Sequence, residues 1–256
     1  MDPNILAALA ADAGSRRSWT SHETPGAYER RPCPGAPWTS LDETALDGYF
    51  AEPDSATLAA LEGLIVRRDS ALQPTVAGYA LFGVHPELLR PAWRVVSEDL
   101  RSGGTDRLET EGPAPQAIAQ VEAFLWRNLR LGRPEEEEAP EYPPAAVLEA
   151  VANAVAHRDY AAASQVFVRL YDDRLEIQSP GGLPPDRTLE ALLADGESYP
   201  RNPVIAGALR RMGLMAESGR GLALIRQEMA SLGSAPPEFA ADAHGFRVTL
   251  PNRART

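Results

Sequence analysis

Three polar side chains at four-residue spacing could do chemistry in this chain. Glu149, Asn153 and His157 fall within the helical pattern of residues 148–157, and residues four apart lie on one face of a helix. The apolar residues between them fall on other faces, toward a core. A carboxylate, an amide and an imidazole in line can hold a metal-bound phosphate and activate a water. Taken alone, the triplet favours the alternative of an amphipathic helix whose polar stripe faces solvent.

The segment after this helix favours the chemical interpretation. Residues 165–171 and 174–178 alternate and are separated by a two-residue turn signal, which predicts a β-hairpin. The second strand runs into residues 179–184 (SPGGLP). There Gly181 and Gly182 let backbone N–H groups approach a ligand closely. An ordinary turn at the end of a strand explains this glycine pair equally well.

A second glycine pair, Gly219 and Gly221, opens the helical pattern of residues 222–229. Free N–H groups and the helix dipole favour an anion at such a helix start. A flexible helix entry is the alternative, and a lone Gly-x-Gly is weak evidence. The order of the parts carries more information: polar-faced helix, hairpin, glycine loop, variable segment, Gly-x-Gly, helix, and a last strand at residues 245–250.

In this order the chain resembles a known family. The matching motifs are Glu149-x-x-x-Asn153-Ala154 with residues 157–160 (HRDY), 179–184 (SPGGLP), 201–203 (RNP) and 217–222 (ESGRGL). They are similar to the ATP-binding domain often labelled RecG-like C-terminal, a divergent branch of the GHKL ATPases. The resemblance covers roughly residues 142–251. It implies an α+β two-layer sandwich of the GHKL, or Bergerat, type, preceded by a smaller, mainly helical α/β region.

A second resemblance lies upstream. Residues 73–86 are similar to the segment that precedes this domain in Schlafen/AlbA-type bacterial regulators, where a nucleic-acid-binding module usually stands further N-terminal. About seventy residues precede Gln73, too few for that module plus its connection. Residues 27–31 (AYERR) and 41–50 look like its tail end. We therefore expect that module to be truncated or degenerate, which weighs against the family's DNA-binding role.

The resemblance implies a role for each site residue. Asn153 would coordinate Mg²⁺ through its side-chain oxygen, with the metal bridging the triphosphate of ATP, and Glu149 would orient or deprotonate the attacking water. His157 would contact phosphate or hold the helix end. Residues 183–218 would form a lid. The other cofactor-binding candidates are Ser179, Gly181 and Gly182 at the adenine pocket, Gly219, Arg220 and Gly221 around the phosphates, and Arg158 beside His157.

One position departs from the wider GHKL pattern, in which an Asp of the first glycine motif accepts from the adenine amino group. Ser179 stands at that place here. Serine can accept a hydrogen bond, but we expect weaker selectivity for adenine. Slow hydrolysis, or binding without hydrolysis, is expected for the same reason.

Composition excludes several other classes. The chain has no lysine, so it is neither a P-loop nucleoside triphosphatase of the helicase type nor a Schiff-base enzyme. Its single cysteine, Cys33, excludes an internal disulfide and a cysteine-based zinc site. Residues 157–160 mimic a kinase catalytic loop, but Ser164 stands where the loop requires Asn. No apolar run could span a membrane, and we expect the chain in the cytoplasm.

Segment composition predicts the domain organisation. Residues 1–40 are rich in Pro, Gly, Ser and Arg and are expected to be loosely ordered. Residues 41–130 form a mainly helical connecting domain with a short strand near Trp93. Residues 131–141 form an acidic linker, residues 142–252 the ATP-binding domain, and residues 253–256 a tail.

Three functional hypotheses remain open. The first is an ATP-binding protein with slow Mg²⁺-dependent hydrolysis that acts as a regulatory switch. The second is a pseudo-ATPase that serves as a protein-interaction scaffold. The third is a DNA-binding transcriptional regulator, by family analogy alone; the net charge of −11 argues against it, because DNA binding needs basic patches. Many GHKL relatives dimerise when ATP closes the lid, so a homodimer is a further expectation.

Overall fold

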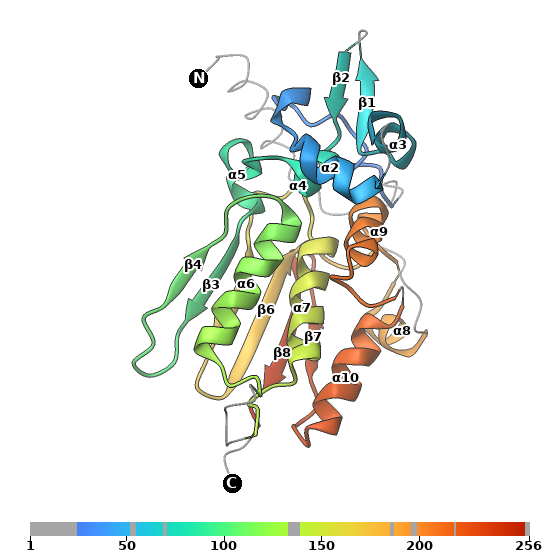
Figure 1. Ribbon diagram of the computed structural model, residues 1–256. Helices are drawn as coiled ribbons and strands as arrows, with labels where there is room; N and C mark the ends of the chain where they lie inside the picture. Colours follow the sequence, from blue (N-terminus) through green and yellow to red (C-terminus); the bar gives the residue numbers. More distant parts are fainter. Residues whose placement is uncertain are drawn as a thin grey trace.

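The computed structural model describes residues 25–51, 55–68, 71–132, 139–184, 187–195, 199–217 and 219–253. These residues form a mixed α/β fold with one six-stranded and one two-stranded sheet (Figure 1). Within this part of the chain, no helix is both long and apolar enough to cross a membrane. Residues 1–24 and the acidic run at 135–138 lie outside the described residues, so the expectations for them stay untested.

The six-stranded sheet has the order β4-β3-β5-β6-β8-β7. Only β3 and β5 run parallel, and every other pair of neighbours is antiparallel. The predicted hairpin is confirmed as β5 and β6, and the predicted last strand as β8. The bounds are β3 Val95–Asp99, β4 Arg107–Glu109, β5 Val166–Leu170, β6 Arg174–Pro180, β7 Glu238–Ala241 and β8 Gly245–Pro251.

Helices pack against one face of this sheet (Figure 1). Helix α6 (Ala114–Asn128) packs on β3, α7 (Pro144–His157) packs on β6, and α10 (Gly221–Ser231) packs on α7. Along β5, Val166, Val168 and Leu170 are buried, while the alternate residues are partly exposed. Such alternation is expected of a strand with one covered face.

A smaller, mainly helical region lies at one end of the sheet. Its core is α4 (Val76–Phe82), whose residues are all buried and which contacts both α6 and α9. Gly78 is required there because a Cβ atom would overlap the carbonyl oxygen of Leu64. The other elements of the whole described chain, in addition to those already given, are α2 Glu43–Phe50, α3 Ser55–Glu62, β1 Ile65–Arg68, β2 Ala71–Pro74, α5 Pro86–Leu89, α8 Leu189–Asp195, α9 Pro203–Arg211, and the 3-10 turns η1 Trp38–Ser40 and η2 Pro91–Trp93.

Two features of the structure differ from the domain organisation expected from the sequence. The short strand predicted near Trp93 is β3, and it pairs with β5, so the connecting region and the C-terminal region share one sheet. Residues 25–40 are packed rather than loosely ordered, since Glu29, Cys33 and Ala36 are all buried. Their Pro- and Gly-rich sequence has no periodicity, and pattern alone therefore could not reveal irregular structure held by long-range contacts.

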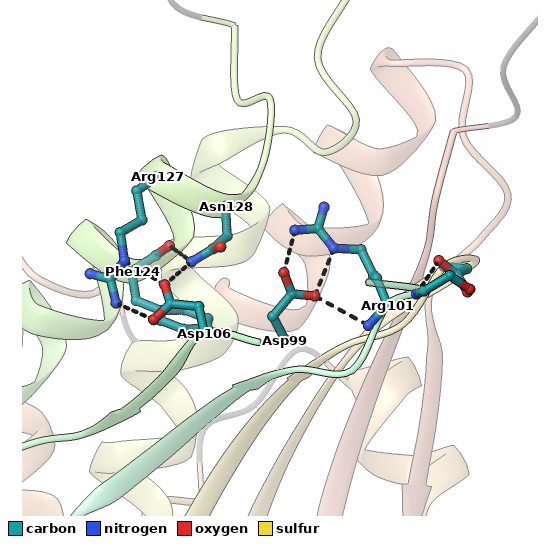
Figure 2. A network of polar contacts seen from close by, with 8 residues as sticks. Asp99, Arg101, Asp106, Phe124, Arg127 and Asn128 are labelled. Carbon is teal, nitrogen blue, oxygen red and sulfur yellow. Dashed lines mark hydrogen bonds and ion pairs between the residues drawn. The ribbon is translucent and has the colours of Figure 1, made fainter. Parts of the chain in front are cut away.

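Polar contacts fix the end of the sheet that carries the β3–β4 turn (Figure 2). Asp106 accepts hydrogen bonds from Arg127 Nε at 2.6 Å and from Asn128 Nδ2 at 2.7 Å. Asp99 pairs with Arg101 at 2.7 Å. These donors hold the pKa values of both carboxyl groups below their usual range. The strand register places this network at the opposite end of the sheet from the glycine loop that follows β6.

Candidate functional site

Helix α7 presents an amide and a carboxylate that are already paired. Asn153 Nδ2 donates to Glu149 Oε1 and to the Glu149 carbonyl oxygen, both at 2.8 Å. Glu149 Oε2 accepts from the backbone N–H of Ala216, also at 2.8 Å. These bonds fix which way the Asn153 amide points. Its Oδ1 takes part in no hydrogen bond among the described residues, so it is left available to a ligand.

The second glycine motif passes directly over this pair. Helix α10 begins at Gly221, where a Cβ atom would overlap Glu149 Oε1 and lie 2.9 Å from Asn153 Nδ2. Only glycine allows the helix start to approach so closely. The first N–H groups of a helix lack partners inside the helix. The structure therefore places a helix start, whose N–H groups and dipole favour an anion, next to the amide and the carboxylate.

A pocket lies between α7, α10, the adjoining ends of β6 and β8, and the segment that follows the first glycine motif. Seven of the ten predicted site residues line it: Asn153, His157, Ser179, Gly181, Gly182, Gly219 and Gly221. Glu149 is 5% exposed and contacts the lining through Asn153. The other lining residues are Ala150, Ala154, Ile177, Leu183, Pro184, Arg187, Leu192, Leu193, Tyr199, Arg201, Leu222, Ala223, Ile225, Arg226, Phe246 and Val248.

The charged residues that line the pocket are all arginines. They are Arg187, Arg201 and Arg226, and no carboxylate belongs to the described lining, although the whole chain carries a net charge of −11. Arg187 stacks 3.7 Å over the ring of Tyr199, and Arg226 donates to the carbonyl oxygen of Leu193. A cavity with one sign of charge and low-dielectric walls concentrates ions of the opposite sign. This pocket therefore suits an anion.

His157 faces the pocket as a neutral imidazole. Burial, and then the charges of Arg210 and Arg201, lower its pKa from 6.5 to about 4. Its ring nitrogens make no hydrogen bond within the described part of the chain. A neutral imidazole offers one N–H donor and one acceptor, so His157 can bind a ligand oxygen without adding charge.

The 201–203 motif holds the pocket together. Asn202 Nδ2 donates to the carbonyl oxygens of Ala156 and Arg158, both at 2.8 Å, at the end of α7. Arg201 Nη2 donates to the carbonyl oxygen of Gly182 at 2.9 Å, and its Nη1 lies 3.7 Å from Asp159. The motif thus joins the end of α7 to the glycine loop. The family resemblance included residues 201–203 among its matching motifs but did not predict these contacts.

Arg158 and Arg220 lie outside the pocket. Arg158 is 1% exposed and donates to the carbonyl oxygens of Ala92 at 2.6 Å and Ser164 at 2.8 Å. Arg220 is exposed and pairs with Glu217 at 3.2 Å. The structure therefore does not bring these two predicted residues to the pocket. Conversely, no sequence pattern indicated Arg187 or Arg226, because isolated arginines are ordinary surface residues.

No curated protein matches the chain. Among solved structures, the crystal structure of the DIP2311 protein from Corynebacterium diphtheriae superimposes with a TM-score of 0.68 at 24% sequence identity. That match covers 88% of this chain, which spans 40% of the DIP2311 chain, and at this identity it shows the fold alone. Residues 163–250 match the HATPase-type family described as "Putative ATP-dependent DNA helicase recG C-terminal", which confirms the family resemblance inferred from the motifs.

Proposed function

We propose that the chain binds ATP with Mg²⁺ in this pocket, within a GHKL-type two-layer sandwich, and acts as a nucleotide-dependent switch with slow hydrolysis. One observation carries the proposal: the paired Glu149 and Asn153 lie against the start of α10, beside a pocket whose charged lining residues are all arginines. The HATPase-type match supports nucleotide binding. It begins at residue 163, so the roles of the α7 residues rest on geometry.

The donor atoms fit Mg²⁺. Asn153 Nδ2 is held by Glu149, so the atom that remains for a ligand is Oδ1, an oxygen of the kind Mg²⁺ prefers. Among the described residues, no group of three or more His, Cys, Asp or Glu side chains is arranged so that it could hold a metal ion by itself. Proteins usually hold Mg²⁺ through few side chains plus substrate phosphates, so one amide suffices. Bound there, the ion would neutralise charge on the triphosphate.

The chain's own groups divide the remaining work. The N–H groups at the start of α10 and the pocket arginines would bind phosphate oxygens. The apolar floor formed by Ile177, Phe246 and Val248 would pack against the base. The Ser179 hydroxyl lines the same floor and makes no hydrogen bond among the described residues. Because a hydroxyl both donates and accepts, it would discriminate weakly between bases.

Glu149 would orient the attacking water. Each of its oxygens already accepts one hydrogen bond, from Asn153 and from Ala216. A carboxylate has about four acceptor sites, so room remains for a proton of that water. A positioned base of this kind contributes roughly 10²–10⁴-fold to a rate. The same tight hydrogen bonding motivates a second candidate function, a pseudo-ATPase scaffold that binds nucleotide without turning it over.

Calorimetric titration of the whole chain with ATP tests the proposal. We expect saturable binding that weakens when Mg²⁺ is chelated and weakens at least tenfold in Asn153→Ala. Asn128→Ala is the matched control, because Asn128 is also partly buried and bonded through Nδ2 but lies at the opposite end of the sheet. Failure of the folded wild-type chain to bind any nucleoside triphosphate would refute the proposal.

Phosphate release then separates the two candidate functions. If the wild type releases phosphate slowly and Glu149→Gln releases none, the switch with hydrolysis is supported. If the wild type binds ATP but releases phosphate no faster than Glu149→Gln does, the scaffold is favoured. The expected homodimer can be followed in the same samples by light scattering with and without ATP.

A further inference from the structure

Glu29 has a fully buried carboxyl group that holds the start of a helix 175 residues away in sequence. Its Oε1 accepts from the backbone N–H of Val204 at 2.8 Å, and its Oε2 accepts from that of Ile205 at 3.0 Å. Both donors belong to the first turn of α9. A carboxylate is stabilised at a helix N-terminus by the free N–H groups and by the helix dipole. Glu29 therefore fixes where α9 begins.

The segment that carries Glu29 connects two parts of the fold. On one side, the N–H of Ala77 in α4 donates to the Glu29 carbonyl oxygen at 2.8 Å. On the other side, Gly26 N–H donates to the carbonyl oxygen of Arg201 at 2.9 Å. A Cβ atom at Gly26 would lie 2.9 Å from Pro203, so the contact is tight. Residues 25–31 thus lie between the N-terminal helical region and the start of α9.

The residues at the start of α9 also hold the pocket. The carbonyl oxygen of Arg201 accepts from the Gly26 N–H, and the Arg201 guanidinium donates a hydrogen bond to the carbonyl oxygen of Gly182 in the glycine loop. Asn202 donates to the carbonyl oxygen of Ala156 in the last turn of α7, three residues after Asn153. Hydrogen bonds, joined by the backbone of residues 201–205, therefore connect residues 25–31 through the start of α9 to two walls of the pocket. Such a connection can carry energetic coupling when its members shift together.

We infer that Glu29 is a positioning residue for the nucleotide pocket: it holds the first turn of α9, and thereby holds Arg201 against the glycine loop. The inference rests on the proposed function for its ligand, but the mechanical link can be measured without nucleotide. It assigns a role within this chain to residues 27–31, which the family resemblance linked only to the tail end of an upstream module. It also gives the N-terminal region a route by which it affects ligand binding.

The test uses the full chain with Glu29→Ala and Glu29→Gln. Glu87→Ala is the matched control, because Glu87 is also buried and accepts a backbone N–H, from Gly112 at 2.9 Å, but it belongs to α5. We expect Glu29→Ala to raise the Kd for MgATP about tenfold, or about 1.4 kcal/mol. Glu29→Gln, which keeps one acceptor oxygen, should raise it less, and Glu87→Ala should leave it within twofold.

A double-mutant cycle shows whether Glu29 acts through Arg201. If it does, Glu29→Ala combined with Arg201→Ala raises the Kd no further than Arg201→Ala alone, because the two effects share one route. Additive losses would overturn the inference, as would an unchanged Kd in a folded Glu29→Ala variant. Where the alanine variant fails to fold, the same comparison is made with Glu29→Gln.

Hydrogen exchange separates failure of this inference from failure of the proposed function. In the ligand-free chain, the amides of Ser179, Gly181, Gly182 and Leu183 should exchange faster in Glu29→Ala than in the wild type. Their exchange rates should be unchanged in Glu87→Ala. Faster exchange in Glu29→Ala, together with a wild type that binds no nucleotide, would refute the nucleotide function and keep the positioning role. Unchanged exchange in Glu29→Ala would overturn the positioning role whatever the wild type binds.

Discussion

Asn153 donates its side-chain amide to Glu149 across one helical turn, at 2.8 Å from Nδ2 to Oε1. This bond decides the chemistry that each residue offers. The amide nitrogen is used inside the protein, so the amide oxygen is the atom left to a ligand. The carboxylate is held between that amide and the N–H of Ala216, so its position is fixed before any ligand arrives.

Glu149→Gln should separate binding from turnover. Glutamine keeps the size of the side chain and an acceptor oxygen for Asn153 Nδ2, but its neutral amide cannot take up a proton from the attacking water. We expect ATP binding within a few-fold of wild type and phosphate release lowered by roughly 10²–10⁴-fold. Calorimetry and a phosphate-release assay measure the two effects. Wild-type turnover in this variant would remove Glu149 from the proposed mechanism.

Gly221→Ala should disrupt the hydrogen-bonded pair of Glu149 and Asn153 without altering either residue. The added Cβ would overlap Glu149 Oε1, so either α10 or the carboxylate must move. We expect at least a tenfold weaker MgATP affinity and a destabilisation of about 1–3 kcal/mol. Gly48→Ala is the control, because a Cβ there meets no atom within 4 Å. Equal effects of the two substitutions on affinity would contradict the close approach of α10.

Glu29 should make stability fall as pH rises. Burial raises its pKa from 4.5 to about 7, while the N–H groups of Val204 and Ile205 and the charge of Arg30 oppose the shift. Between pH 4.5 and 7 the unfolded chain loses this proton while the folded chain keeps it. The free energy of unfolding therefore falls as pH rises through this range, by up to about 3 kcal/mol from this group. Urea unfolding of the wild type and Glu29→Gln from pH 4.5 to 8 measures it. A constant difference between the two proteins would disprove the shift.

His157 should produce the opposite slope. Its pKa falls from 6.5 to about 4, so between these pH values the unfolded chain binds a proton that the folded chain does not. Its contribution to stability is therefore present above pH 6.5 and lost as pH falls toward 4. His157→Gln, which stays neutral, should remove this slope. NMR titration of the imidazole checks the same shift directly, and an ordinary pKa would refute the burial argument.

Arg158→Ala should affect stability rather than the pocket. The substitution leaves the carbonyl oxygens of Ala92 and Ser164 without their donor and opens a cavity in the core, at a cost of about 3 kcal/mol or more. We expect a lower melting temperature and an unchanged Kd for MgATP at temperatures where the variant is folded. A large rise in Kd without destabilisation would return Arg158 to the site predicted from the sequence.

Local sequence patterns were sufficient for the parts of the site that lie within single elements. The four-residue spacing of Glu149, Asn153 and His157 placed them on one face of α7, because helical periodicity depends only on nearby residues. Alternation and a turn signal predicted β5 and β6 for the same reason. The two glycine motifs marked backbone that approaches a ligand, and most of their residues line one pocket.

The tertiary structure alone decided which of these residues meet and what surrounds them. The pairing of β3 with β5 joined two predicted domains in one sheet. The arginines of the pocket come from three separate segments of the chain. Arg158 is buried in the core although its neighbour His157 faces the pocket. Glu29 reaches a helix 175 residues further along the chain. Sequence periodicity describes one element at a time, whereas these contacts depend on how elements pack, which is set by burial over the whole chain.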